Sequence, residues 1–277
     1  MSATTFSIAT ELRRQASRPR TRIALGFMVV LPLIILTAFS LGGGDEDNNN
    51  GSGAFGSLVG LATSGGMNFA LFTLLVSSTF LLVVVVALFH GDTVASEASW
   101  GSLRYLLAIP VPRSRLLGVK LVVSMFYSAV AMVLLVGTAL AVGTARYGWH
   151  PLRSTVADEL AGGTAVLRLA GAVGYIAVSL MIVAALAFLL SVSTDAPLGA
   201  VGGAVLLQIL SSILDQITAL GSLRNVLPTH YANAWLALLS TPIQTDDLVR
   251  GCITSISFAV VLFGFAFWRF LRKDVVS

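Results

Sequence analysis

The sequence has little charge and almost no cysteine. Only 11% of its 277 residues are charged, whereas charged residues normally make up about a quarter of a soluble domain. Hydrophobic residues make up 56%, and the mean hydropathy is +0.89. So few charged side chains could not cover the surface of a water-soluble globule of this size. The single cysteine, Cys252, excludes an internal disulfide and a cysteine-based metal site. These features predict a polytopic membrane protein.

The sequence also lacks the common catalytic motifs. It has no G-x-x-x-x-G-K-[ST] loop for ATP phosphates, no H-E-x-x-H metal site and no G-x-S-x-G nucleophile. Its three histidines, His90, His150 and His230, fall at the ends of apolar segments or in loops, where we expect interfacial residues. We therefore expect no catalytic residue, no metal and no cofactor bound by this chain, and no nucleic-acid partner.

Six apolar stretches are long enough to cross the roughly 30 Å hydrocarbon layer of a bilayer as helices. They cover residues 23–41, 67–89, 116–142, 167–190, 197–214 and 252–268. Lys120 and Arg168, the only charged residues within them, lie near the start of their spans, where they are expected to snorkel to the headgroups. The pattern predicts an all-α membrane protein with one transmembrane domain over residues 1–277.

The basic residues divide unequally between the two sides of the predicted bundle. Six is an even number, so both termini share one side, and that side holds 12 of the 17 Lys and Arg residues. The positive-inside rule therefore predicts cytoplasmic termini. The first span is expected to be a retained anchor, because its apolar core is longer than the 7–15 residues of a signal peptide.

Three further segments flank the spans. Before the first span, apolar residues recur at steps of three and four: Phe6, Ala9, Leu12 and Ala16. This pattern predicts a short amphipathic helix in the interface, and a mobile basic tail is the alternative. Residues 42–66 are rich in glycine, asparagine and acids and are expected to be a flexible external loop. Between spans five and six, Tyr231 and Trp235 predict external short helices dipping into the outer leaflet, or ordinary loop packing.

The stretch of residues 90–120, between spans two and three, is the most informative. It is about thirty residues long, far more than a plain connection needs, and it contains Trp100 and several leucines. Exposed apolar residues on a cytoplasmic loop indicate a docking surface for a second protein, although they could also anchor the loop on the membrane.

The same stretch resembles a known family. Its pattern is Glu97, then Gly101-Ser102-Leu103, Leu106-Leu107, Pro110-Val111, Arg113, Leu117 and Lys120. This is similar to the signature of ABC-2 type permeases, the membrane subunits of ATP-binding-cassette exporters, and the resemblance extends to the six spans and the entry helix. It implies a cytoplasmic coupling helix between spans two and three that contacts a separate ATPase. The residues that it assigns to this coupling surface are Glu97, Trp100, Gly101, Ser102, Leu103 and Arg104.

The resemblance also implies the rest of the assembly. The expected complex contains two cytoplasmic ATPase subunits, which bind ATP and Mg²⁺, and a second permease subunit, identical or related, in the plasma membrane. The mostly apolar spans are compatible with a drug, lipid or peptide as the exported substrate.

A translocation pathway is expected between spans two and five. In the resembling family these spans border the central pathway, which would place Ser78, Gln208 and Asp215 near the substrate. Hydrogen bonding between helices is the alternative role for these side chains. An ion-coupled transporter or an intramembrane enzyme is the alternative function, and Asp215 is the only acid that a coupled transporter could use within a span.

Overall fold

The structure is a computed structural model and describes residues 7–42, 54–101, 112–153 and 162–272. Within these ranges six helices are long and apolar enough to cross a membrane, as the sequence predicts. They are α2 (Pro19–Gly42), α5 (Leu81–Ser99), α7 (Arg113–Tyr147), α8 (Gly162–Ser193), α9 (Pro197–Gln216) and α10 (Asp246–Arg272). Their lengths and hydropathy fit a multi-pass membrane protein.

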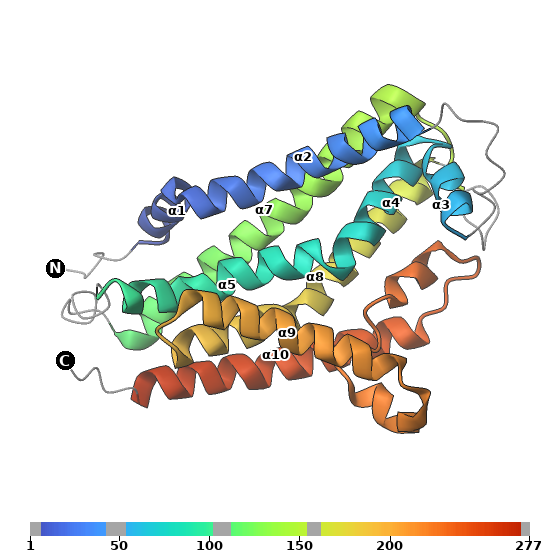
Figure 1. Cartoon of the computed structure of the whole chain (residues 1–277). Helices are drawn as coiled ribbons and strands as arrows, with labels where there is room; N and C mark the ends of the chain where they lie inside the picture. The colour runs from blue at the N-terminus through green and yellow to red at the C-terminus, as the bar shows by residue number, and fades with distance from the viewer. Residues whose placement is uncertain (1–6, 43–53, 102–111, 154–161, 273–277) are drawn as a thin grey trace.

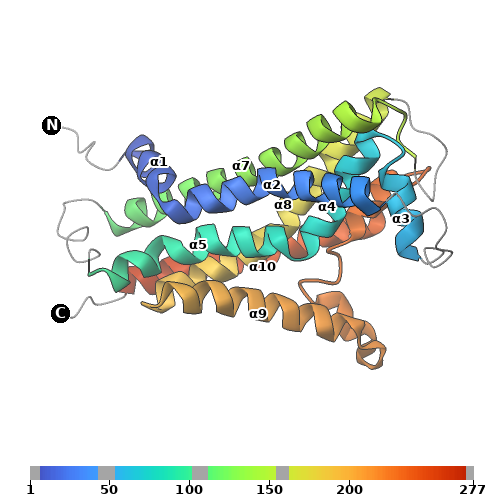
Figure 2. The ribbon, with the colours of Figure 1, turned by 45° about the horizontal axis from the view of Figure 1, so that its top comes forward.

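The long helices form an elongated bundle in which α8 packs against α10, α5 and α9 (Figure 1). Helix α5 is the most enclosed of the six helices. In its most apolar 18-residue stretch 78% is buried inside the protein, whereas the corresponding value is 17% for both α2 and α9. The connection from α8 to α9 is short, as expected, and Pro197 occupies the first turn of α9. The beginning of α2 and the end of α10 lie at the same end of the bundle (Figure 2).

The second predicted span is two helices instead of one. Helix α4 (Gly66–Thr79) ends at Phe80, whose φ of −132° and ψ of −56° leave the helical region, and α5 begins at Leu81. Ser78, two residues before the break, competes with the helical backbone for hydrogen bonds. The Ser78 hydroxyl does so by donating to the carbonyl of Leu75 at 3.0 Å.

Helix α5 continues ten residues beyond the predicted end of the second span. It ends at Ser99, and α7 begins at Arg113, so the expected thirty-residue cytoplasmic loop is wrong. Much of that stretch is helix packed against α7 and α8. The predicted coupling helix falls on residues that lie mostly outside the described ranges.

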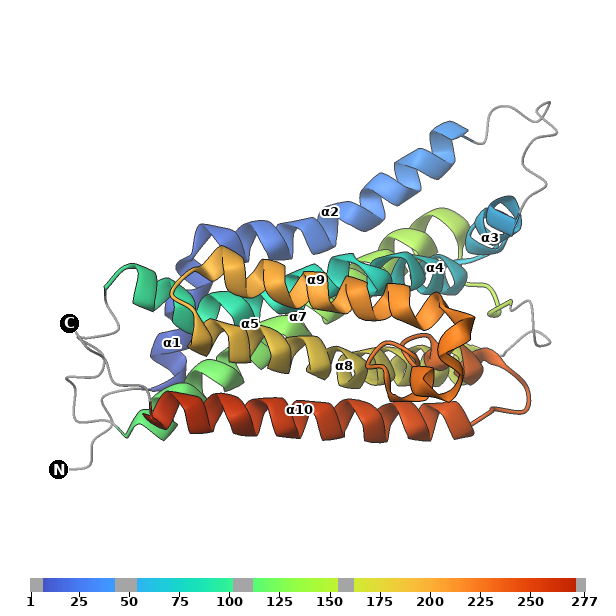
Figure 3. The same ribbon diagram turned by 60° about the horizontal axis from the view of Figure 1, so that its bottom comes forward.

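Two shorter elements also differ from the sequence-based prediction. The predicted flexible loop contains helix α3 (Ala54–Ala62). Between α9 and α10 the structure has two 3₁₀ helices, η1 (Thr218–Val226) and η2 (Ala234–Leu239), seen near the beginning of α10 in Figure 3. Trp235 of η2 is only 1% exposed and packs in the helical core, so it does not face an outer leaflet.

The predicted entry helix is present as α1 (Ile8–Ser17). Ser7 caps it by accepting a hydrogen bond from the backbone N–H of Thr10 at 3.2 Å. Its buried residues are polar, Glu11 and Gln15, whereas Ala9 and Ala16 of the predicted apolar face are exposed. The helix therefore attaches to the bundle through charge as well as through apolar contacts.

Candidate functional sites

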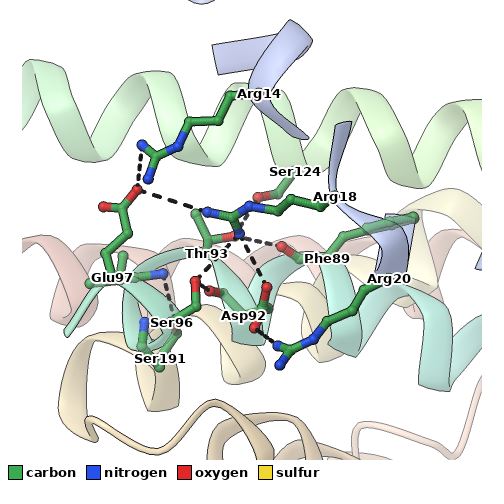
Figure 4. Close-up of polar contacts among 12 residues, drawn as sticks. Arg14, Arg18, Arg20, Phe89, Asp92, Thr93, Ser96, Glu97, Ser124 and Ser191 are labelled. Carbon is green, nitrogen blue, oxygen red and sulfur yellow. Dashed lines mark hydrogen bonds and ion pairs between the residues drawn. The ribbon is translucent and has the colours of Figure 1, made fainter. Parts of the chain in front are cut away.

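A cluster of seven charged residues joins α1 and the start of α2 to α5 and α7. We call it the charge clamp; it consists of Glu11, Arg14, Arg18, Arg20, Asp92, Glu97 and Lys120. It contains four cations and three carboxylates, and all three carboxylates are buried. Figure 4 shows the arginines reaching from α1 and α2 towards the acids of α5.

Glu97 is the centre of the charge clamp. Its Oε1 atom lies 2.6 Å from Lys120 Nζ and 2.9 Å from the Arg14 guanidinium. Both Glu97 and Lys120 are at most 1% exposed, and Lys120 also contacts Glu11 at 3.3 Å. A buried charge is tolerated only when it is paired and hydrogen-bonded, and these contacts meet that requirement.

Side-chain contacts correct three expectations from the sequence. Glu97 is enclosed by the chain's own helices and is not accessible as a docking residue. Lys120 does not snorkel to headgroups, because the carboxylates of α1 and α5 hold its ammonium group inside the bundle. Arg168 does not snorkel either, since its guanidinium donates to the carbonyls of Leu238 and Ser240 at 2.8 and 2.7 Å.

Asp92 forms the second half of the charge clamp, one turn before Glu97 on α5. Its two carboxylate oxygens lie 3.1 Å from Arg18 and 2.5 Å from Arg20. The Arg18 guanidinium also donates to the hydroxyl of Ser96 at 3.3 Å. Because Arg18 and Arg20 flank the junction of α1 and α2, these bonds fix the angle at which the entry helix meets the bundle.

Trp100 and Gly101 follow the charge clamp directly. Trp100 is 66% exposed, and the guanidinium carbon of Arg18 lies 5.9 Å from the centre of its ring. Gly101 has a φ of +67°, a left-handed conformation that favours glycine. The remaining predicted coupling residues, Ser102, Leu103 and Arg104, lie outside the described residues.

The three predicted pathway residues line one cavity of about 180 Å³. Ser78 enters it beside the break between α4 and α5, and Gln208 and Asp215 enter it from α9. The opposite wall belongs to α8 and to the segment after η1, and most of the lining residues are polar. We call this space the polar cavity.

Asp215 carries the charge of the polar cavity and has two cationic or hydrogen-bonding neighbours. Its Oδ1 atom lies 2.6 Å from His230 Nδ1 and 3.5 Å from Arg224 Nε. The nearby hydroxyls of Ser211 and Thr229 are 2.8 Å apart. These contacts tie the end of α9 to the segment that leads to η2, so Asp215 has a structural role as well as a place in the cavity.

The sequence reasoning missed two groups of site residues. His230 was assigned to the interface, and no local spacing could have linked it to Asp215 across the fifteen residues that contain η1. The partners of Glu97 were missed as well, although one signal was available. An ionisable residue such as Lys120 within an apolar span requires a partner, and Glu97 and Glu11 were among the few acids on the same side.

Among the described residues no group of three or more His, Cys, Asp or Glu side chains is arranged to hold a metal ion. The carboxylates of the charge clamp instead face arginine and lysine side chains.

A family model matches most of the chain. A search of curated proteins finds no match to the chain. Residues 48–276 match a family model described as "Protein of unknown function (DUF2705)". The matched region includes the break at Phe80, the polar cavity and the α5–α7 part of the charge clamp, and it covers most of the sequence. The chain is therefore a member of the DUF2705 family.

Proposed function

We propose that this protein is the permease subunit of an ABC-2 type exporter, which forms a translocation pathway and is driven by a separate ATPase. The observation that carries the proposal is the charge clamp beside Trp100. It joins α1 to α5 and α7 through buried ion pairs, so α1 and the start of the segment expected to touch an ATPase form one rigid unit.

A coupling surface must be accessible and must also transmit force. Trp100 meets the first requirement because it is 66% exposed at the end of α5. The charge clamp meets the second, since a push on α1 or Trp100 reaches α5 and α7 through paired charges. Docking changes the state of the spans only if the ATPase contacts one state more favourably than the other.

The polar cavity is the proposed part of the pathway. It lies where α4 and α5 separate, so movement of α5 at the charge clamp would change its shape. Its hydroxyl, amide and carboxylate groups favour an amphipathic substrate, with a drug, lipid or peptide as the candidate classes. The chain itself is proposed to be non-catalytic, with ATP and Mg²⁺ bound by the partner.

The proposed complex contains two permeases, identical or related, and two ATPase subunits in the plasma membrane. Helices α2 and α9 favour a second permease, because large apolar residues remain exposed along both. Examples are Phe27 on α2 and Leu206 on α9, which are 47% and 67% exposed. The same faces would otherwise contact lipid.

The test of this function is docking at Trp100. The chain is co-expressed with ATP-binding-cassette subunits encoded beside it, and the complex is purified and assayed for ATP hydrolysis. Trp100→Ala is expected to lower the recovery of the ATPase at least tenfold, as loss of an exposed aromatic anchor does at other interfaces. Trp149→Ala is the matched control, because Trp149 is 55% exposed on the far side of α7.

Two outcomes would contradict the proposal. One is that no ATPase co-purifies with the unmodified chain. The other is that Trp100→Ala and Trp149→Ala recover the same amount of ATPase with the same turnover. A crosslinker placed at position 100 should also join the chain to the ATPase.

A proton-coupled transporter is the second candidate function. The Asp215–His230 contact in the polar cavity favours it, because such pairs form proton relays in membrane transporters. The two candidates differ in energy source. Transport that a protonophore abolishes in the presence of ATP would support coupling to protons, whereas transport that needs only ATP hydrolysis by a partner would support the exporter.

A further inference from the structure

A second cavity lies along α8 and shares one lining residue, Leu180, with the polar cavity. It has a volume of about 310 Å³, within the roughly 300–1,000 Å³ range of small-molecule sites. Helix α5 forms its floor, and α7 and α8 form its walls. Its lining is almost wholly apolar, with methionines on both walls, and contains no charged residue. We call it the apolar groove.

The apolar groove is open towards the membrane. Ala129 on α7 and Ala177 on α8 both line it and are both exposed, so the rim is made of small side chains. Helices α7 and α8 pack on α5 much more than on each other. A molecule dissolved in the bilayer can therefore enter between them without passing through water.

Two polar side chains interrupt this apolar lining, His90 on the floor and Ser128 on one wall. His90 is 1% exposed and Ser128 is 8% exposed. Neither His90 Nε2 nor Ser128 Oγ has a hydrogen-bond partner among the described residues. A buried polar atom that makes no hydrogen bond costs about 1–3 kcal/mol, so a ligand that supplies one is favoured.

The helix register brings these two residues to the same level. Helices α5 and α7 run antiparallel, with the hydroxyls of Thr93 and Ser124 2.8 Å apart. His90 lies about one turn before Thr93, and Ser128 lies one turn after Ser124. In an antiparallel pair these steps lead in the same direction along the bundle. One polar group of a ligand could therefore meet both side chains.

The hydrogen bonds of His90 define what that polar group must do. His90 Nδ1 lies 2.9 Å from the carbonyl oxygen of Val86, which can only accept, so Nδ1 carries the hydrogen. In the neutral ring Nε2 is then an acceptor and needs a donor. The hydroxyl of Ser128 can donate to an acceptor. A hydroxyl group satisfies both, since it donates one hydrogen and accepts another.

We propose that the apolar groove binds a lipophilic alcohol or phenol from the bilayer. Its hydroxyl donates to His90 Nε2 and accepts from Ser128, while its apolar body packs against Met132 and Met181. Apart from Leu180, this site shares no lining residue with the polar cavity, and it does not depend on the proposed exporter function.

The test uses a matched pair of photoreactive probes on the full-length chain in phosphatidylcholine nanodiscs. One probe is an alkylphenol with a diazirine in its tail, and the other is the same alkylbenzene without the hydroxyl. The phenol is expected to label residues 125–132 and 177–184 saturably, in competition with unlabelled alkylphenol. The benzene is expected to label them about tenfold less, which corresponds to one neutral hydrogen bond.

Variants separate hydrogen bonding from simple partition into lipid. His90→Leu and Ser128→Ala are each expected to reduce or remove the preference for the phenol, and Ala177→Phe to block labelling by both probes. Ala38→Phe on α2 is the matched control and should change nothing, because Ala38 is also exposed but lies away from the groove.

Two results would overturn the proposal, and both come from the unmodified protein. Equal labelling by the two probes would mean that a water molecule, not a ligand hydroxyl, serves His90 and Ser128. Labelling spread evenly over lipid-facing α2, α9 and α10 would mean that the groove has no preference for the probe. Neither result depends on whether a variant folds.

Discussion

Gly251 on α10 allows a tyrosine to reach across from α8. The Tyr175 hydroxyl donates to the carbonyl of Tyr231 at 2.7 Å. A Cβ atom at position 251 would lie 2.8 Å from the Cβ of Tyr231 and would overlap the Tyr175 hydroxyl. The absence of a side chain at this one residue therefore permits a contact among α8, α10 and the segment before η2.

Gly251→Ala is expected to destabilise the protein by about 1–3 kcal/mol, since it overpacks a closed contact. The control is Gly264→Ala on the same helix, where no atom lies within 4 Å of the added Cβ. That change should be neutral or stabilising by up to about 1 kcal/mol through helix propensity. Unfolding in mixed micelles with rising dodecyl sulfate measures both, and equal stabilities would contradict the steric argument.

The residue scale also shows what a sequence can and cannot predict about the sites. The family resemblance implied that Ser78, Gln208 and Asp215 lie near a substrate pathway, and the three side chains line one cavity. The burial of Glu97 was not predicted. Its surroundings depend on how α1 packs against α5. A glutamate that follows an apolar run gives the same sequence pattern whether it is buried in the protein or exposed to water.

At the scale of the helices, the charge clamp is the strongest link between α1 and the bundle. Glu97 and Lys120 join α5 to α7, and Glu11 and Arg14 add α1 to the same group. Removing one member of a buried pair leaves the other charge uncompensated. The stability of all three helices should therefore depend on this one pair.

Glu97→Gln is expected to lower the free energy of unfolding by about 3 kcal/mol, and Glu97→Gln with Lys120→Met by less, because the second change removes the orphaned ammonium group. Arg20→Met is the control, since the Arg20 side chain is 55% exposed and should contribute less than about 1 kcal/mol. Thermal unfolding in detergent compares the four proteins. If the double variant is less stable than Glu97→Gln alone, the pairing argument fails.

The helices themselves were largely predictable, and their interruptions were not. Hydropathy predicts six spans because the bilayer demands about twenty apolar residues from each crossing helix. Hydropathy did not predict the break at Phe80, because the short polar run at residues 77–79 lies within one long apolar stretch. The extension of α5 to Ser99 was missed because its last turns carry polar residues that face the charge clamp.

At the scale of the whole molecule, the arrangement of the ends predicts sidedness. Trp100 follows the charge clamp at the end of α5, and Trp149 follows the far end of α7, so the two lie at opposite ends of the bundle. With Cys252→Ser as background, Trp149→Cys should react with a membrane-impermeant maleimide in intact cells. Trp100→Cys should react only after permeabilisation. The reverse pattern would place the termini outside and contradict the orientation drawn from the basic residues.

The charge clamp has a consequence for biogenesis. The arginines of α1 and α2 leave the ribosome well before Asp92, Glu97 and Lys120 are synthesised. The entry helix must therefore remain at the membrane surface until the second and third spans have inserted. Only then can its charged residues form ion pairs with Asp92, Glu97 and Lys120. A chain without its first eighteen residues would still insert its spans. It would lack Arg14 and Arg18, however, so Asp92 and Glu97 would lose ion-pair partners, and quality-control proteases would be expected to degrade it.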